Sequence, residues 1–303
     1  MKNEKKSNTG IYVTRALSLI CIIALMVIGL SSCVDQSSGA SHSKKSSANL
    51  IATSPAAAEI CNHLDLDLVG VCKTSHKLPE RYRDIPQVGL PMNPDLEVIK
   101  SLSPDYVISP SSLENDLKPK YESIDVKPIF LDLKSVNGMY DSMDQLGEKF
   151  GRQKQAEKMR KEYDSFMKDW NAKNKGKDKP KVLVLMGLPG SYIVATPNSY
   201  VGSLVEMAGG INVFSDTDKE FLNANTEEIK QTEPDVILRA AHAMPEDVKA
   251  MFADEFKTNQ IWKHFNAVKN GRVYDLDPSL FGMSATFAYP EALEELQPML
   301  YEK

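Results

Sequence analysis

A histidine and a methionine that each lie beside a chain reversal are the side chains best placed to contact a ligand. His242 follows the apolar run 236–238 in "RAAHAMPEDV", and Met92 lies in "VGLPMNPDLEVIK", immediately before a helical pattern. In open α/β sheets, ligands bind outside the carboxyl ends of strands, so both residues are candidates for contacting one ligand where two lobes meet. Each also has a structural explanation, with Met92 filling a core and His242 satisfied by backbone hydrogen bonds. The pattern alone leaves both explanations open.

The sequence lacks the common motifs of catalysis. It contains no Gly-x-Ser-x-Gly elbow, no His-Glu-x-x-His, no Gly-x-Gly-x-x-Gly and no Walker loop, and "GLPGSYIV" predicts only a turn after a strand. A carrier of bare zinc or manganese would use several histidines and a carboxylate around one ion. His63 is expected on the surface of the first helix, and His264 at a core edge or in solvent. These observations weigh against an enzyme and against a bare-ion carrier.

The N-terminal residues 1–32 predict a lipoprotein signal peptide. Basic residues precede an uncharged apolar run over 16–30, which is short for a membrane-spanning helix. The run ends in Leu30-Ser31-Ser32-Cys33, which resembles the bacterial lipobox and predicts acylation of Cys33. An uncleaved anchor with an incidental cysteine is the alternative. Residues 33–49 are rich in serine and predict a flexible tether, so the folded body is expected on the outer face of a membrane, held by a lipid anchor.

Charge and cysteine content narrow the classes of partner. Removal of residues 1–32 takes away four positive charges and one negative charge, so the formal net charge changes from −5 to about −8. This acidic balance argues against binding of nucleic acid. We expect a monomer. Beyond the signal peptide and Cys33, only Cys61 and Cys72 remain, and they could form a disulfide or stay as two buried free thiols.

An internal repeat indicates two similar lobes. Glu97-Val98-Ile99-Lys100 followed by Pro104-Asp105 matches Glu227-Glu228-Ile229-Lys230 followed by Pro234-Asp235, each position displaced by 130. Each copy predicts a short helix that ends before proline and leads into a buried strand. We therefore predict an α/β fold with one lobe over 50–134 and a second over 180–303. Apolar spacing over the connector 135–179 predicts two helices, the second covering about 153–171 and roughly 28 Å long.

Four stretches, spread over both lobes, carry a resemblance to a known family. They are "LPERYRDIPQVGLPMNPDLEVIKSLSPD", "KVLVLMGLPGSYIVAT", "RAAHAMPEDVKAMF" and "IWKHFNAVKNGRVYDL". They resemble the haem-binding lipoproteins of the iron-regulated surface determinant (Isd) importers, which are substrate-binding proteins of the helical-backbone, metal-receptor class. The resemblance covers the chain after the lipobox. It implies two α/β lobes joined by a single long helix, the class III periplasmic-binding-protein arrangement.

The resemblance also implies roles for particular residues. It makes Met92 of the first lobe and His242 of the second the axial ligands of haem iron, a pair used where iron is held rather than set to activate oxygen. Haem propionates need donors, and Ser54 as N-cap with Pro55 and Ala56 in the first turn of a helix forms an anion site.

Three further assignments follow from the same family. The "TSHK" loop matches a propionate-contacting segment at His76 and Lys77. His76 departs from the family, which usually has an aromatic hydroxyl there, and it could either donate to a propionate or replace Met92 as a ligand. Glu97 and Glu227 would dock on arginines of the ABC permease.

The sequence thus predicts a lipid-anchored haem receptor of a Gram-positive bacterium. It would take haem from cell-wall or secreted haem proteins and deliver it to an ABC permease for iron acquisition. Two other functions stay open: a receptor for a siderophore or corrin chelate on the same fold, and a haem-handling enzyme. The enzyme would need an open iron position and a reductant site, and no second-cofactor motif is present.

Overall fold

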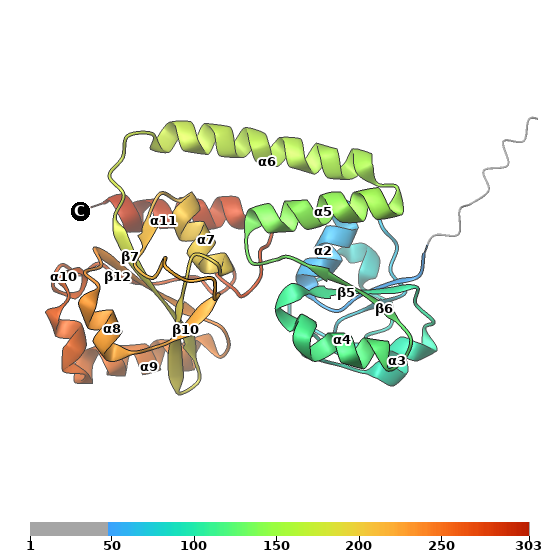
Figure 1. Ribbon diagram of the computed structural model, residues 1–303, viewed down its shortest axis with the longest axis horizontal. Helices are drawn as coiled ribbons and strands as arrows, with labels where there is room; N and C mark the ends of the chain where they lie inside the picture. The colour runs from blue at the N-terminus through green and yellow to red at the C-terminus, as the bar shows by residue number, and fades with distance from the viewer. Residues whose placement is uncertain (1–47, 303) are drawn as a thin grey trace, which may run out of the picture. The chain divides into compact units, whose positions relative to one another are not determined.

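Two β-sheets organise residues 48–302, the part of the chain that this computed structural model describes (Figure 1). The predicted signal peptide, Cys33 and almost all of the predicted tether lie outside the described residues. The first sheet has the order β2-β1-β5-β6, and all its pairings are parallel. Its strands are β1 (Leu50–Ala52), β2 (Gly70–Val71), β5 (Tyr106–Pro110) and β6 (Lys127–Leu131).

Helices cover both faces of the first sheet. The helices are α2 (Pro55–His63), α3 (Leu96–Ser101) and α4 (Glu114–Glu122), with short 3-10 turns η1 (Glu80–Tyr82) and η2 (Ser111–Leu113). Because side chains alternate along a strand, Leu50 and Ala52 face the core that contains α2, whereas Ile51 faces the core that contains α3 and α4. A small antiparallel hairpin of β3 (Gly89–Leu90) and β4 (Asn93–Pro94) accompanies this sheet.

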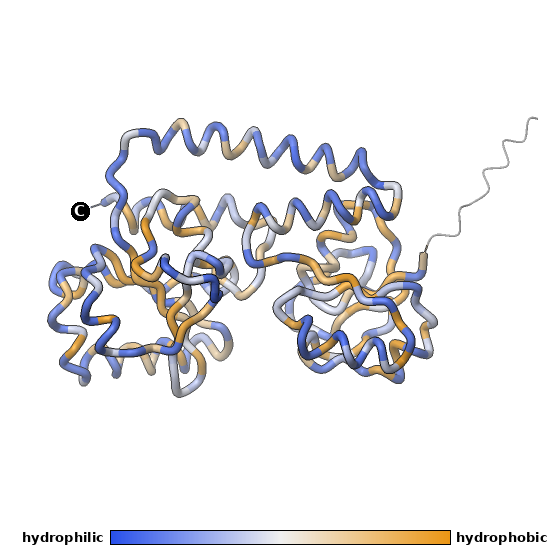
Figure 2. The backbone as a smooth tube through the Cα atoms, viewed as in Figure 1, coloured by the Kyte–Doolittle hydropathy of each residue, from blue (hydrophilic) through white to orange (hydrophobic). Residues whose placement is uncertain are grey.

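The second sheet has the order β10-β8-β7-β11-β12, and β9 pairs with β7 at the strand start. Its strands are β7 (Lys181–Leu188), β8 (Ser191–Ala195), β9 (Ile211–Asn212), β10 (Phe221–Asn223), β11 (Val236–Ala241) and β12 (Val273–Asp275). Its helices are α7 (Tyr200–Met207), α8 (Thr226–Gln231), α9 (Pro245–Thr258), α10 (Asn266–Lys269) and α11 (Tyr289–Tyr301), with η3 (Gln260–His264). The predicted turn in "GLPGSYIV" joins β7 to β8, and Gly190 adopts φ 80° there. Figure 2 shows the apolar strands at the centre of each sheet.

The connector is a pair of helices, α5 (Val136–Phe150) and α6 (Gln153–Asn174). Gly151 ends α5 in a left-handed conformation, and α6 runs for 22 residues, about 33 Å. Arg160 of α6 forms ion pairs with Asp141 and Asp144 of α5, each at 2.6 Å. Trp170 Nε1 donates to the Met207 carbonyl at 2.9 Å. The long helix is therefore attached both to α5 and to the second lobe, and the predicted fold class is confirmed.

The repeat in the sequence is also a repeat in the hydrogen bonding. The Asp105 carboxylate accepts from the Asn49 amide at 2.7 Å, and the Asp235 carboxylate accepts from the Lys181 amide at 2.7 Å. Each aspartate thus ties the segment that follows its helix to the start of the neighbouring parallel strand. Ile99 and Ile229, also 130 positions apart, are both fully buried. The two lobes use the same local structure to join a short helix to a central strand.

Cys61 and Cys72 are both buried and free. Burial raises the pKa of the Cys61 thiol to about 12 and that of the Cys72 thiol to about 11. Of the two alternatives for this pair, the structure therefore has two protonated free thiols. Within residues 48–302, none of the helices is long and apolar enough to cross a membrane.

Candidate functional site

The residues predicted to bind a ligand in the first lobe lie at the carboxyl ends of neighbouring strands. Ser54 follows β1, and His76 and Lys77 follow β2. The β3–β4 hairpin continues alongside β2, because the Val88 amide donates to the Val71 carbonyl at 2.8 Å and the Lys73 amide to the Gly89 carbonyl at 2.7 Å. Parallel strands end at one edge of their sheet, so the structure brings these groups to a common edge.

Ser54 caps α2 as the sequence predicts. Its backbone is extended, its hydroxyl accepts from the Ala57 amide at 3.1 Å, and Pro55 occupies the first helical turn. The Ala58 amide donates to the Ser54 carbonyl at 3.0 Å. Two amides of this helix start are therefore used within the helix, which leaves Ala56 to supply an N–H for an anion. The predicted anion site therefore offers one free backbone N–H in this turn, that of Ala56.

The loop after β2 presents His76 and Lys77 to solvent. The His76 amide donates to Thr74 Oγ1 at 3.0 Å, which fixes the backbone of the turn. Burial raises the pKa of the Glu59 carboxyl on α2, and the nearby charge of His76 partly offsets this rise. The His76 side chain thus lies within electrostatic reach of the helix that Ser54 caps.

Met92 lies at the turn of the β3–β4 hairpin, with 68% of its surface exposed. A methionine that filled a core would be buried, so this structural explanation of Met92 is wrong. The side chain is instead available to a ligand.

His242 is the first residue after β11, and its side chain is exposed. Its backbone amide donates to the Gly187 carbonyl at 3.0 Å, on the neighbouring strand β7. Among the described residues, no hydrogen bond to the imidazole itself is present. The backbone is therefore held while the ring is free, contrary to the explanation of a histidine whose ring is satisfied by the backbone.

Close packing of α9 fixes the loop that carries His242. A Cβ atom added to Gly187 would lie 2.7 Å from Phe252 Cε2 and closer still to Val248 Cγ1, so only glycine allows α9 to approach β7 here. Met244 then adopts a left-handed backbone, with φ 47° and ψ 61°, and Pro245 begins α9. A strained residue in the turn and a helix packed on the sheet together determine where His242 lies.

Arg239 clamps the same end of β11. Its guanidinium binds both carboxylate oxygens of Asp275 on β12, at 2.8 and 2.7 Å. The group also lies over the rings of Phe252 and Phe256, at 5.5 and 4.9 Å from their centres. The Arg239 side chain is 12% exposed and that of Asp275 is 29% exposed, so this pair is partly shielded from solvent, and it ties β11 to both β12 and α9.

Glu97 and Glu227 occupy equivalent positions near the starts of α3 and α8. Both are exposed, and the Asp95 and Asn225 side chains accept from their amides at 3.0 Å. Each of these helices packs on the face of its sheet opposite to the core shared by α5, α6 and α11. Apart from a 3.8 Å ion pair between Glu227 and Lys230, these carboxylates are open to a partner.

The remaining histidines lie elsewhere. The His63 ring packs on Phe287, with ring centres 4.1 Å apart, a contact that the sequence did not suggest, and His264 is exposed on η3. Residues 48–302 contain no group of three or more histidine, cysteine or acidic side chains that could hold a bare metal ion.

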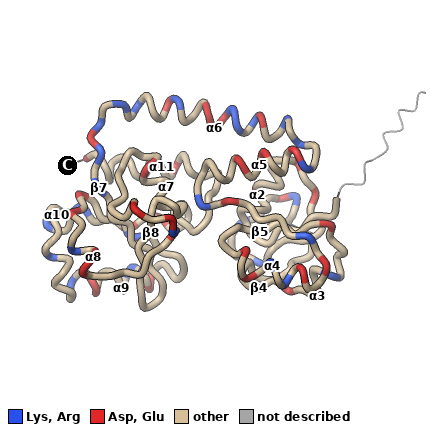
Figure 3. The backbone as a smooth tube through the Cα atoms, viewed as in Figure 1, with Lys and Arg blue, Asp and Glu red and all other residues tan. Residues whose placement is uncertain are grey.

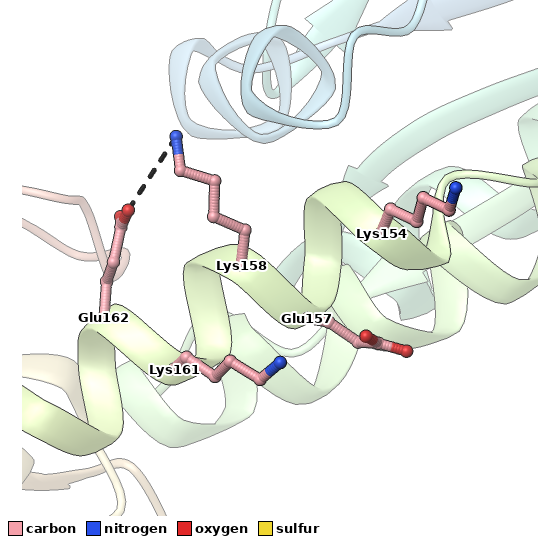
Figure 4. A pocket seen from close by; sticks show the side chains of 5 residues that line it. All are labelled: Lys154, Glu157, Lys158, Lys161 and Glu162. Carbon is pink, nitrogen blue, oxygen red and sulfur yellow. Dashed lines mark ion pairs between the residues drawn. The ribbon is translucent and has the colours of Figure 1, made fainter.

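A shallow hollow beside α6 is a different feature (Figure 4). It is lined by Lys154, Glu157, Lys158, Lys161 and Glu162. Basic and acidic side chains alternate along this helix (Figure 3), and Lys158 lies 3.8 Å from Glu162. All five lining side chains are charged, and their charges are of both signs, so we assign no ligand to the hollow.

Comparison with known proteins identifies the family. The model for periplasmic binding proteins matches residues 50–280. The high-affinity heme uptake system protein IsdE of Staphylococcus aureus (strain Newman) is 42% identical over 290 residues, which cover 95% of this chain and 99% of that protein.

Two solved structures are similar over the whole folded body. IsdE of S. aureus complexed with heme has a TM-score of 0.80 and 42% identity, and an ABC transporter substrate-binding protein from Listeria monocytogenes EGD-e has 0.81 and 50%. Each covers 84% of this chain and 99% of its own. The match to the family model over most of the chain and this level of identity show that the chain belongs to the periplasmic binding protein family.

Proposed function

We propose that this protein is the haem receptor of an ABC importer, in which Met92 and His242 hold the haem iron. It is a binding protein, not an enzyme, and its cargo is haem. The observation that carries the assignment of ligands is that both side chains are exposed on loops at strand ends, next to backbone that hydrogen-bonds to a neighbouring segment. The similarity to IsdE, at 42% identity over nearly the whole chain, supports haem as the ligand.

A thioether and an imidazole suit a carrier. Both axial positions of the iron would be filled, which leaves none open for oxygen and favours low-spin iron. One ligand comes from the hairpin beside the first sheet and the other from the second sheet. Coordination would therefore require both lobes, and separating them would release the iron.

The propionates would be received at the edge of the first sheet. Ala56 supplies an amide at the start of α2, whose positive dipole end favours an anion. His76 and Lys77 are exposed on the adjacent loop and could add donors and charge. In this arrangement His76 acts on a propionate, and Met92 remains the iron ligand.

Delivery would use the two equivalent glutamates. Glu97 and Glu227 are exposed and lie on the sheet faces that do not carry α6, so basic residues of the permease could reach both. Acylation of Cys33 would keep the receptor on the outer face of the membrane, where cell-wall or secreted haem proteins would supply the haem. Exposed charge pairs would speed the encounter and keep it brief.

The test is the absorption spectrum of residues 48–303 with added haemin, for the native protein, Met92→Ala and His242→Ala. The two similar solved structures match 84% of this chain over 99% of their own length, so a fragment of about this extent is expected to fold alone. We expect a sharp low-spin spectrum from the native protein that is lost or shifted in both variants. His264→Ala, which changes an exposed histidine on η3, is the control and should leave the spectrum as it is.

Identical spectra for the native protein and both variants would contradict the proposed ligands. Absence of haem binding by the native fragment would contradict the function itself.

A further inference from the structure

Large apolar side chains that are exposed concentrate on the two loops that carry the proposed ligands. Within residues 48–302, four such residues are present: Leu90 at 56% exposure, Met92 at 68%, Ile211 at 45% and Met244 at 58%. Leu90 precedes Met92 by two positions, and Met244 follows His242 by two. Only Ile211 lies elsewhere, on β9. A grouping of this kind marks a surface that becomes covered by something apolar.

Met244 has a left-handed backbone conformation, which is unfavourable for methionine and suggests a functional role for its side chain. Four non-glycine residues in the described part of the chain have positive φ, and three of them are aspartate or serine. The left-handed conformation crowds any side chain, so glycine or asparagine is the usual choice in such turns. Strained backbone conformations cluster at active sites, ligand clamps and switch regions. A methionine at this turn is therefore best explained by what the side chain contacts in the bound state.

Leu90 is also exposed from a backbone that is held by hydrogen bonds. It pairs with Asn93 across the β3–β4 hairpin, and the carbonyl of the preceding residue, Gly89, accepts from the Lys73 amide just after β2. Two residues along a chain span at most about 7 Å, so Leu90 and Met244 each lie near the proposed ligand on the same loop. A side chain this close to an axial ligand of haem would lie over the porphyrin ring.

We propose that Leu90 and Met244 determine specificity by packing on the porphyrin ring, one from each lobe, so that the macrocycle binds even without iron. The inference rests on the proposed function and adds a second determinant to it. Met92 and His242 would select for the metal, and Leu90 and Met244 for a flat apolar ring. A small hydrophilic iron chelate could satisfy the first pair but would leave the second exposed.

Metal-free protoporphyrin IX tests the proposal, because axial ligation cannot contribute to its binding. Its fluorescence is titrated with residues 48–303 of the native sequence and with Leu90→Asn and Met244→Gln, which keep the size of each side chain and make it polar. We expect the native protein to bind and each variant to bind roughly tenfold more weakly. Leu90→Met and Met244→Leu, which keep an apolar side chain at each position, should bind as the native protein does.

Two controls separate this result from other effects. Ile211→Asn changes the exposed apolar residue that lies away from both loops, and His264→Ala changes an exposed histidine on η3; neither should change porphyrin affinity by more than about twofold. Thermal unfolding is recorded for all variants and should be unchanged, because the altered side chains are exposed.

The outcomes distinguish the inference from the proposed function. If the native protein binds haemin but not metal-free porphyrin, or if Leu90→Asn and Met244→Gln bind it as Ile211→Asn does, the ring contact is wrong and the haem receptor stands. If metal-free porphyrin binds as expected while the haemin spectra of Met92→Ala and His242→Ala equal that of the native protein, the ring contact stands and the proposed ligands are wrong.

Discussion

Replacement of Gly187 by alanine should destabilise the second lobe and displace the loop of His242. A Cβ atom at this position would lie 2.7 Å from Phe252 Cε2 and closer to Val248 Cγ1, and both residues are almost fully buried on α9. Neither side chain has room to move away, so α9 must shift on the sheet. Overpacking of this kind costs about 1–3 kcal/mol. The Gly187 carbonyl also accepts the His242 amide, so the shift should reach the proposed ligand.

Gly282→Ala is the matched control. A Cβ atom there would contact nothing within 4 Å, and neither Gly187 nor Gly282 has a positive φ. Both substitutions therefore reduce the conformational freedom of the unfolded chain in the same way, by about 0.4–1 kcal/mol, and differ in the steric clash. The difference between their free energies of unfolding in urea should be about 1–3 kcal/mol.

Thermal unfolding gives a second measurement of the same clash. For a body of this size the loss corresponds to a midpoint lowered by about 2–4 °C per kcal/mol. Equal stability of Gly187→Ala and Gly282→Ala would refute the claim that α9 packs against a glycine. A low-spin haem spectrum unchanged in Gly187→Ala would refute the coupling to His242.

Three further outcomes are expected. Arg239→Ala should lower the free energy of unfolding by about 2 kcal/mol in urea titrations, because it removes two charged hydrogen bonds to Asp275 and the contact of the guanidinium with two rings. Arg83→Ala, which removes an exposed ion pair, should cost under about 0.5 kcal/mol, and equal losses would contradict the role of Arg239. His63 is exposed overall, but partial burial of its ring, which packs on Phe287, lowers its pKa in the folded state. The unfolded chain therefore takes up the proton first, and stability should fall as pH drops through and below 6.5. His63→Gln should flatten that dependence, and parallel stability curves would contradict it. Because Cys61 and Cys72 are free and buried, the folded fragment 48–303 should not react with a disulfide reagent at pH 8. After denaturation both thiols should react without added reductant. Fast reaction of the folded protein would contradict their burial.

Much of the fold follows from patterns that the sequence repeats. The segments Glu97–Asp105 and Glu227–Asp235 each lead from a short helix into the strand that begins at the next residue, because proline prevents the helix from continuing and the aspartate binds the start of the neighbouring strand. The connector helices were predicted by apolar spacing on either side of Gly151, and α6 ends at Asn174, three residues beyond its predicted end. Local chemistry determines these elements, so a single sequence suffices to predict them.

The remaining features depend on contacts between distant segments. Nothing near Gly187 in the sequence indicates that Val248 and Phe252 will press against it. The left-handed backbone of Met244 likewise follows from how α9 packs on β7, because methionine has no preference for that conformation. The sequence predicts an anion site at the first turn of α2, but it does not show that capping by Ser54 and helix formation use two of the amides there. Such details follow from tertiary packing and were not predicted.

The backbone segments that carry the two proposed ligands are held by different numbers of contacts. His242 follows a six-residue strand that lies between β7 and β12, and Arg239 and Gly187 fix that strand end against α9. Met92 lies on a hairpin of two two-residue strands whose described pairings with the first sheet are few. Local stability follows the number of buried contacts and shielded hydrogen bonds, so the hairpin should open at a lower free energy than the end of β11. If these side chains are the axial ligands, a small movement would withdraw the methionine first and leave the haem on the histidine. A receptor built in this way can hold its cargo firmly and still begin to release it from one side.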